Sequence, residues 1–166
     1  MLPKHHKSSF FLEAGLFDNL SRFVELEKRI SELPTTVDVG DAFEVFAEAY
    51  SFTQKIEQAE EVWPFKSVPS DIKEELSLGT TQKDMGVDGV YHTISDGFNA
   101  YQAKFRTNRK PLTWSEISTF MGLTDKVDQR VLFTNSNDIT SVINERSDFH
   151  CIRGNDLDRL DKNDFD

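Results

Sequence analysis

Apolar residues recur with two different spacings along the chain, and these spacings predict its helices and strands. Over residues 16–33 they recur every three or four positions, which predicts an amphipathic helix that Pro34 ends and that follows a loose start over residues 1–10. A second helix is predicted over residues 42–59, with Asp41 as its N-cap. This second helix has a wide apolar surface, so we expect it to be largely buried.

Two short segments rich in strand-forming residues predict a β-hairpin. They cover residues 86–93 and 98–105, and the turn sequence Ser95-Asp96-Gly97 lies between them. Similar patterns predict further strands at 61–64, 130–134 and 149–152, helices at 113–123 and 139–146, and a short helix or irregular insertion at 69–78. Strands that alternate with helices in this way are typical of an α/β fold with a mixed sheet.

The composition fits one ordered domain of 166 residues, of which 37% are hydrophobic. The formal net charge is −10. A protein that coats nucleic acid without specificity is normally basic, so this charge argues against that class and leaves a local basic site open. The single cysteine, Cys151, excludes an intrachain disulfide framework, and no apolar run is long enough to span a membrane. We therefore expect a soluble, cytoplasmic protein.

Polar side chains occur in the hairpin at strand positions where a plain core would not place them. Alternation puts Gln102 and Lys104 on one face of the second strand, and Asp88 lies on the adjacent first strand. A charge that is buried without a partner is costly, so these residues are poor choices for packing. They are suited to binding a divalent cation and a water molecule beside a phosphodiester.

A glutamate lies inside the apolar surface of the second helix. Glu44 is flanked by Phe43, Val45 and Phe46, and Glu48 follows one turn later on the same side. A glutamate in such surroundings needs a cation, a hydrogen-bond partner or an edge position. Two interpretations stay open: Glu44 contributes to a functional site, or both glutamates lie on a solvated edge.

A cluster of positive charge follows the hairpin directly. Four cations lie within seven residues with no acid among them, namely Lys104, Arg106, Arg109 and Lys110. In so acidic a chain this is a local reversal of charge, and its position beside the polar hairpin residues favours contact with phosphate. The alternative is that these cations only form a solvated surface.

Three motifs occur along the chain in order: Gly40–Glu44 (GDAFE), residues 84–89 (DMGVDG) and Gln102-Ala103-Lys104. In this order and spacing they resemble the Mrr-like branch of the PD-(D/E)xK nucleases. That branch has a helix-borne glutamate after a glycine, a strand aspartate in a D-x-G-x-D context, and Q-x-K on the next strand. The resemblance covers roughly residues 37–152. It implies a restriction-endonuclease-like α/β fold, which is a mixed β-sheet flanked by helices.

The resemblance also implies divalent-metal-dependent hydrolysis of DNA phosphodiester bonds. Asp88 would be the main metal-binding carboxylate, and Glu44 would complete the ligand shell of Mg²⁺ or Mn²⁺. Gln102 would offer its side-chain carbonyl, with the backbone carbonyl of Ala103 nearby. Lys104 would orient the attacking water or help to deprotonate it. Because Gln102 stands where many relatives have an acid, we expect weak affinity for Mg²⁺ and help from Mn²⁺.

Partners and segments follow from the same resemblance. Arg106, Arg109 and Lys110 would contact the DNA backbone. Such domains often form the N-terminal nuclease module of larger restriction or helicase-linked proteins, so we expect further helicase or translocase domains. A double-strand cut needs two active sites, which predicts dimerisation or the collision of two molecules. The expected segments are a helical extension (1–36), a nuclease-like core (37–153), and an acidic tail or linker to a further domain without a structural element of its own (154–166).

Two other functions are compatible with these residues. A nuclease-fold module that binds nucleic acid or acts as a scaffold without catalysis would fit the net charge of −10 more easily. The intact residues Glu44, Asp88, Gln102 and Lys104 weigh against that reading. The second alternative is a nuclease of the same fold that acts on RNA. The sequence has no phosphate-binding loop motif and no Cys/His pattern of a zinc site.

Overall fold

A mixed five-stranded sheet lies between helices in the computed structural model, which describes residues 3–54, 58–78, 86–140 and 148–165. Its strands follow the chain in order across the sheet: β1 (Ala59–Pro64), β2 (Gly89–Thr93), β3 (Phe98–Lys104), β4 (Gln129–Thr134) and β5 (Phe149–Ile152). The first three strands pair antiparallel, and the last three pair parallel. The predicted hairpin and strands are present, although β2 begins later than expected.

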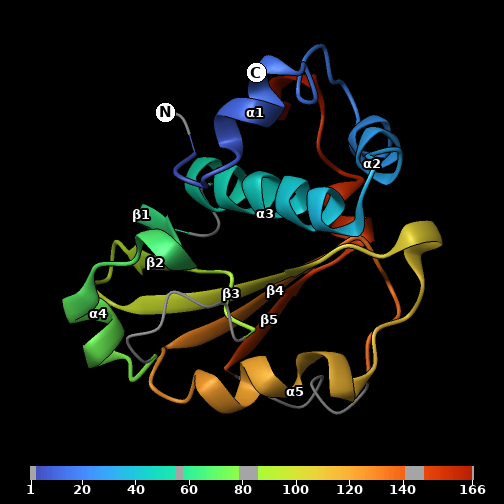
Figure 1. Cartoon of the computed structure of the whole chain (residues 1–166). Helices are drawn as coiled ribbons and strands as arrows, with labels where there is room; N and C mark the ends of the chain where they lie inside the picture. Colours follow the sequence, from blue (N-terminus) through green and yellow to red (C-terminus); the bar gives the residue numbers. More distant parts are fainter. Residues whose placement is uncertain (1–2, 55–57, 79–85, 141–147, 166) are drawn as a thin grey trace.

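Helices cover both faces of the sheet (Figure 1). Helix α3 (Thr36–Thr53) lies across one face, and α5 (Trp114–Leu123) lies across the other. The remaining helices are α1 (Ser8–Glu13), α2 (Phe23–Ser31), α4 (Ser70–Glu75), α6 (Gly154–Leu157) and α7 (Lys162–Phe165), with short 3₁₀ turns η2 (Phe65–Ser67) and η3 (Thr107–Arg109). Within the described ranges, none of the helices combines the length and the apolar character that crossing a membrane requires.

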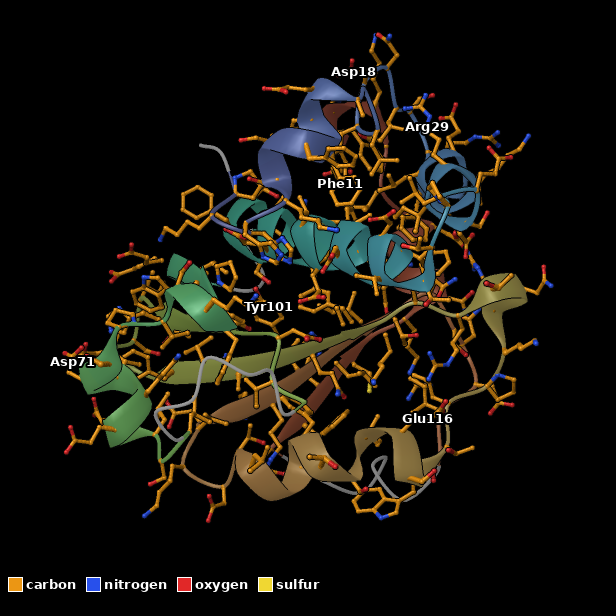
Figure 2. The ribbon with its side chains drawn as sticks, viewed as in Figure 1. Phe11, Asp18, Arg29, Asp71, Tyr101 and Glu116 are labelled. Atoms are coloured by element: carbon orange, nitrogen blue, oxygen red, sulfur yellow. The ribbon has the colours of Figure 1, made fainter. Side chains whose placement is uncertain are left out.

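The alternation of side chains along the strands divides the core into two sides. Odd-numbered residues such as Tyr91 and Tyr101 pack with the apolar side of α3, whereas Val90 and Ala100 pack with Phe120 of α5. Figure 2 shows Tyr101 between the sheet and α3. The predicted burial of the second helix is therefore confirmed.

The glycine of the Asp88-Gly89 pair is required by this packing. A Cβ atom at Gly89 would lie 2.1 Å from the ring of Tyr101, which crosses directly over the glycine. Gly86, three residues earlier, has a φ of 103°, which L-residues rarely adopt. Asp84, the first residue of this motif, lies outside the described residues, as does most of the helix predicted at 139–146.

The N-terminal region differs from the sequence-based expectation. The prediction of a loose start is wrong, because α1 covers Ser8–Glu13 and Phe11 is buried against α3 (Figure 2). The helix predicted over 16–33 begins only at Phe23, after a turn that contains Gly15 at a φ of 78°. Arg29 stabilises this turn by donating hydrogen bonds to its backbone carbonyls.

Helix α3 begins earlier than predicted. Its N-cap is Thr35, whose side-chain oxygen accepts a hydrogen bond from the Asp38 N–H at 3.0 Å. The prediction that Asp41 caps this helix is therefore wrong. Asp41 lies inside the helix, one turn before Glu44, and its carboxylate is available for side-chain contacts.

The acidic C-terminal stretch contains structural elements, contrary to the prediction that it has none. Helices α6 and α7 form there, and Leu157 and Leu160 are buried in the same core cluster as α2, α3 and the sheet. Two aspartates near the starts of these short helices accept the backbone N–H of the residue before each helix, Asp156 from Arg153 and Asp164 from Asp161. The role of this stretch as a linker to a further domain stays a prediction.

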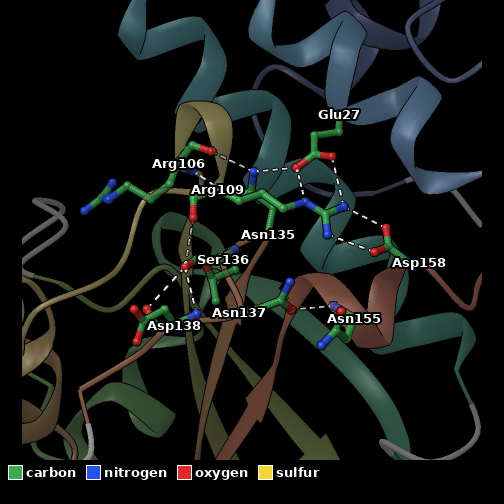
Figure 3. Close-up of polar contacts among 10 residues, drawn as sticks. Glu27, Arg106, Arg109, Asn135, Ser136, Asn137, Asp138, Asn155 and Asp158 are labelled. Atoms are coloured by element: carbon green, nitrogen blue, oxygen red, sulfur yellow. Dashed lines mark hydrogen bonds and ion pairs between the residues drawn. The ribbon is translucent and has the colours of Figure 1, made fainter.

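One arginine joins both terminal regions to the segment that follows β3 (Figure 3). The guanidinium of Arg109 donates to Glu27 of α2 at 2.9 and 3.0 Å, and to Asp158, which ends α6, at 2.8 and 2.6 Å. These contacts lower the pKa of the Asp158 carboxyl below its usual range. Asn135 extends the network, because its amide donates to Glu27 at 2.7 Å and to the Arg106 carbonyl at 2.8 Å. We call Glu27, Arg109 and Asp158 the Arg109 cluster.

Replacement of Arg109 is expected to destabilise the fold. Arg109→Gln leaves the carboxylates of Glu27 and Asp158 facing each other without their shared cation, and we expect the free energy of unfolding to fall by about 2 kcal/mol. Urea denaturation followed by circular dichroism measures this change. Arg159→Gln is the matched control, because that side chain is 81% exposed and 4.0 Å from its acidic neighbour. Equal effects of the two substitutions would contradict the structural role of the Arg109 cluster.

Candidate active site

Hydrogen-bonded pairing between strands β2 and β3 stops next to Asp88, the aspartate of the hairpin. Backbone pairing between β2 and β3 ends at Gly89 and Tyr101, so the last three residues of β3 run beyond the end of β2. Asp88 occupies this opening, where its Oδ2 accepts the N–H of Ala103 at 2.7 Å. The Asp88 backbone is fixed as well, because its N–H donates to the Tyr101 carbonyl and its carbonyl accepts from the Phe65 N–H, both at 2.9 Å. Strand geometry therefore fixes this carboxylate in place.

The neighbouring glutamine has a buried side-chain oxygen that no described residue satisfies. Gln102 is 3% exposed, and its Oε1 makes no hydrogen bond with any described residue. The position where a Cβ on Gly86 would lie is 3.6 Å from Gln102 Nε2, so the glycine leaves room for this amide. A buried carbonyl oxygen without a donor is unfavourable in the absence of a ligand, and a hard cation would satisfy it.

Glu44 and Asp88 line one cavity of about 210 Å³ between α3 and the start of β2. Asp41, His5 and Lys66 line the same cavity. The structure thus brings Glu44 and Asp88 together, although they are 44 positions apart in the sequence. Gln102 and Lys104 are not among the residues that line this cavity. They lie on the neighbouring end of β3, where Lys104 is paired in register with Thr134 of β4.

The two glutamates of α3 have different environments. Glu48 is 2% exposed, which excludes the interpretation that it lies on a solvated edge. Its Oε1 accepts the His5 N–H at 3.0 Å, and its Oε2 accepts the Lys4 N–H. Burial raises the pKa of the Glu48 carboxyl, and these two N–H groups oppose the increase. Glu48 therefore anchors the N-terminal segment over α3, whereas Glu44 faces the cavity.

His5 and Asp41 were not identified as site residues from the sequence. The pair His5-His6 is too short to be recognised as a metal-binding tract, and Asp41 has the sequence context of a helix cap. His5 Nε2 lies 3.7 Å from both Asp41 Oδ1 and Glu44 Oε1. The sequence signal that could have pointed to them is Glu48, an acid within the apolar surface of α3. The structure shows that this side chain is buried beneath the N-terminal segment.

The three cations predicted to bind DNA have unequal surroundings. Arg106 forms an ion pair with Glu116 of α5, and Arg109 is held by the two carboxylates of its cluster. Lys110 is exposed and has no ion pair within the described part of the chain. Contact between these residues and DNA stays a prediction, and Arg109 already has a structural role.

Comparison with known proteins identifies a family and a similar solved structure. A family model described as restriction endonuclease matches residues 53–159, which include Asp88, Gln102 and Lys104 and begin after Glu44. Among solved structures, an ATP-dependent Type ISP restriction-modification enzyme, LlaBIII, bound to DNA is similar with a TM-score of 0.60 and 20% identity. The similarity covers 81% of this chain and 8% of that enzyme, so the chain spans a small part of its length. A comparison with curated proteins gives no match.

These findings confirm the predicted restriction-endonuclease-like fold of a mixed sheet flanked by helices. At 20% identity the similarity to the Type ISP enzyme concerns the fold alone.

The anchoring role of Glu48 is open to a direct test. Glu48→Ala leaves the N–H groups of Lys4 and His5 without an acceptor in a buried place, and we expect the free energy of unfolding to fall by about 2 kcal/mol. The N-terminal segment is also expected to become accessible to trypsin at Lys7 under native conditions. Limited proteolysis followed by mass spectrometry measures this change. Glu13→Ala, an exposed position on α1, is the control and should leave both quantities unchanged.

Proposed function

The chain belongs to the restriction endonuclease family, and from this premise we propose that it is a divalent-metal-dependent endonuclease that hydrolyses DNA phosphodiester bonds. The observation that carries the proposal is the opening of the sheet at Asp88. A fixed carboxylate lies there beside β3, and on the same strand end the buried Oε1 of Gln102 has no hydrogen-bond partner among the described residues. Oxygen donors of this kind fit a hard cation such as Mg²⁺ or Mn²⁺.

The donors present fit such an ion. Asp88 and Glu44 would supply carboxylate oxygens, Gln102 its side-chain carbonyl, and Ala103 its backbone carbonyl. When bound, the ion would stabilise charge on the phosphate and lower the pKa of a water molecule. The Ala103 N–H donates a hydrogen bond to Oδ2 of Asp88, and this bond keeps the carboxylate in one orientation.

Lys104 supplies the positive charge of the proposed site. It follows Gln102 by two residues on β3, so both side chains leave the strand on the same face. Its ammonium group would orient the attacking water and offset charge on the phosphate. Lys110 and Arg106 would contact the DNA backbone next to the site, provided that DNA displaces Glu116 from Arg106.

The proposal extends to a larger assembly. The similar Type ISP enzyme is described as ATP-dependent and was solved with DNA, and this chain is similar to 8% of it. We infer that the chain acts as the nuclease module of a larger restriction or helicase-type protein, and that two copies meet on DNA for a double-strand cut. Delivery of DNA by other domains would also explain how a module with a net charge of −10 reaches a polyanion.

A second candidate function is a nuclease-fold module that binds nucleic acid or acts as a scaffold without catalysis. The observation that favours it is the use of Arg106 and Arg109 in internal ion pairs, which removes cations from DNA contact. Plasmid cleavage separates the two functions.

We expect the protein to nick or linearise supercoiled plasmid with Mg²⁺ or Mn²⁺. Asp88→Asn keeps an acceptor for the Ala103 N–H and removes the charge, while Lys104→Ala removes the ammonium group. Each should lower the cleavage rate at least about 100-fold without loss of folding.

The matched controls are Asp125→Asn and Lys126→Ala, both exposed in the loop between α5 and β4. They should cleave like the wild type. Wild-type protein that binds DNA and cuts it with neither ion would favour the non-catalytic module, and cleavage of RNA alone would assign a different substrate.

The proposed metal ligand Gln102 is neutral, and replacing it with an acid should change the metal affinity. Gln102→Glu adds a negative oxygen where the buried carbonyl oxygen has no donor among the described residues, so Mn²⁺ affinity should rise roughly tenfold. Without metal the buried carboxylate should lower stability, and Mn²⁺ should raise the melting temperature of the variant more than that of the wild type. Water-proton relaxation and thermal unfolding measure the two effects. Gln58→Glu, at an exposed position, is the control, and equal Mn²⁺ affinity of both variants would exclude Gln102 as a ligand.

A further inference from the structure

The first residues of the described chain are docked against the candidate active site. Glu48 accepts the N–H groups of Lys4 and His5, and Lys7 Nζ lies 3.1 Å from Asp38 Oδ1 and 3.2 Å from Asp41 Oδ2. These contacts hold the segment of residues 3–7 on α3. As a result His5 is 5% exposed and lines the same cavity as Glu44 and Asp88.

The contacts of the His5 ring determine which nitrogen carries the proton. The backbone N–H of Lys7 donates to His5 Nδ1 at 3.1 Å, so Nδ1 acts as an acceptor and carries no hydrogen. A neutral imidazole has one N–H, which must then be at Nε2. The group that faces Asp41 and Glu44 is therefore an N–H donor.

This tautomer decides between two roles for the histidine. His5, Asp41 and Glu44 place one possible ligand atom each within 4.8 Å of one another, a spacing that would suit a metal ion. A ligating histidine needs a lone pair on the nitrogen that faces the metal, and its other nitrogen usually donates a hydrogen bond. His5 has the opposite arrangement. The N–H at Nε2 instead attracts one oxygen of each carboxylate electrostatically, since both oxygens lie 3.7 Å away, beyond hydrogen-bond distance.

The two carboxylates differ in what else they contact. Asp41 and Glu44 are three residues apart on α3, so their charges lie on one side of the helix and repel each other. Lys7 offsets the charge of Asp41 at its other oxygen. Glu44 forms no ion pair with a lysine or arginine in the described part of the chain. The His5 N–H is thus the positively polarised group that faces Glu44 from the N-terminal segment, 3.7 Å from its Oε1.

We propose that His5 is a positioning residue of the candidate active site, and that its Nε2–H holds the Glu44 carboxylate toward the cavity lined by Asp88. The effect of His5 on cleavage rests on the proposed nuclease function. The tautomer of the ring and the affinity for Mn²⁺ do not depend on cleavage and can be measured separately.

The test uses the whole chain with His5→Ala and His5→Gln, the second of which keeps an N–H donor. Long-range ¹H–¹⁵N spectra of the wild type should show the proton of His5 on Nε2, both without metal and with Mg²⁺. Mn²⁺ affinity from water-proton relaxation should fall about threefold to tenfold in His5→Ala, since an unfixed carboxylate binds the ion less well. His5→Gln should recover at least half of the loss on a logarithmic scale. In plasmid cleavage, His5→Ala should need a correspondingly higher Mn²⁺ concentration for half-maximal rate.

His92→Gln is the control, because His92 pairs with Glu60 and Asp96 at the hairpin turn and away from the cavity. Circular dichroism and thermal unfolding establish that each variant is folded. A proton on Nδ1, or a metal-induced shift of the Nε2 resonance typical of ligation, would overturn the proposal in favour of a metal ligand. Unchanged Mn²⁺ affinity in a folded His5→Ala variant would overturn it as well. A wild type that fails to cut DNA would overturn the nuclease function only. The positioning role of His5 is tested independently by its tautomer and by the Mn²⁺ affinity of the variants.

Discussion

The hydrogen bond from the Ala103 N–H to the Asp88 carboxylate is the contact on which the candidate site depends. In an uninterrupted antiparallel pair a backbone carbonyl would accept that N–H. Here β2 ends, and a side chain satisfies the donor instead. This exchange lets the end of β3 continue without a neighbour on one side while no backbone donor is lost. It also converts a position in a sheet into a fixed, negatively charged oxygen beside an open space.

The features that could be predicted from the sequence depend on neighbouring residues. The hairpin follows from two strand-like segments around Ser95-Asp96-Gly97, and α5 follows from the Thr113–Glu116 pair, whose carboxylate accepts the Thr113 N–H at 2.8 Å. The buried strand β4 follows from a run of apolar residues. Asp88, Gln102 and Lys104 are proposed as site residues because three short motifs occur in order, and that assignment stays a prediction. The signals for the hairpin, α5 and β4 each lie within the element that they predict.

The features that escaped prediction depend on distant contacts. The N-terminal segment is ordered by Glu48, 43 positions away from His5, and no local pattern around residues 3–7 indicates that partner. The C-terminal stretch has an acidic composition typical of solvated chain, yet Leu157 and Leu160 bury their side chains in the core. Arg109 has the sequence context of a surface cation, and only the fold shows that Glu27 and Asp158 surround it. Charge patterns identify where charges are, whereas three-dimensional packing decides which of them are already neutralised.

The shared core of the terminal segments determines how far this chain can be shortened. Residues 1–36 and 154–166 contribute Phe11, Phe23, Leu26, Ile30 and Leu157 to the cluster that covers α3 and one face of the sheet. A fragment trimmed to the motif-bearing residues 37–153 would expose that apolar surface and leave α3 without its cover. The part of the chain that folds as one unit is therefore larger than the stretch that carries the recognisable motifs. A boundary drawn before Asp158 would also break the Arg109 cluster, because that residue is one of its two carboxylates.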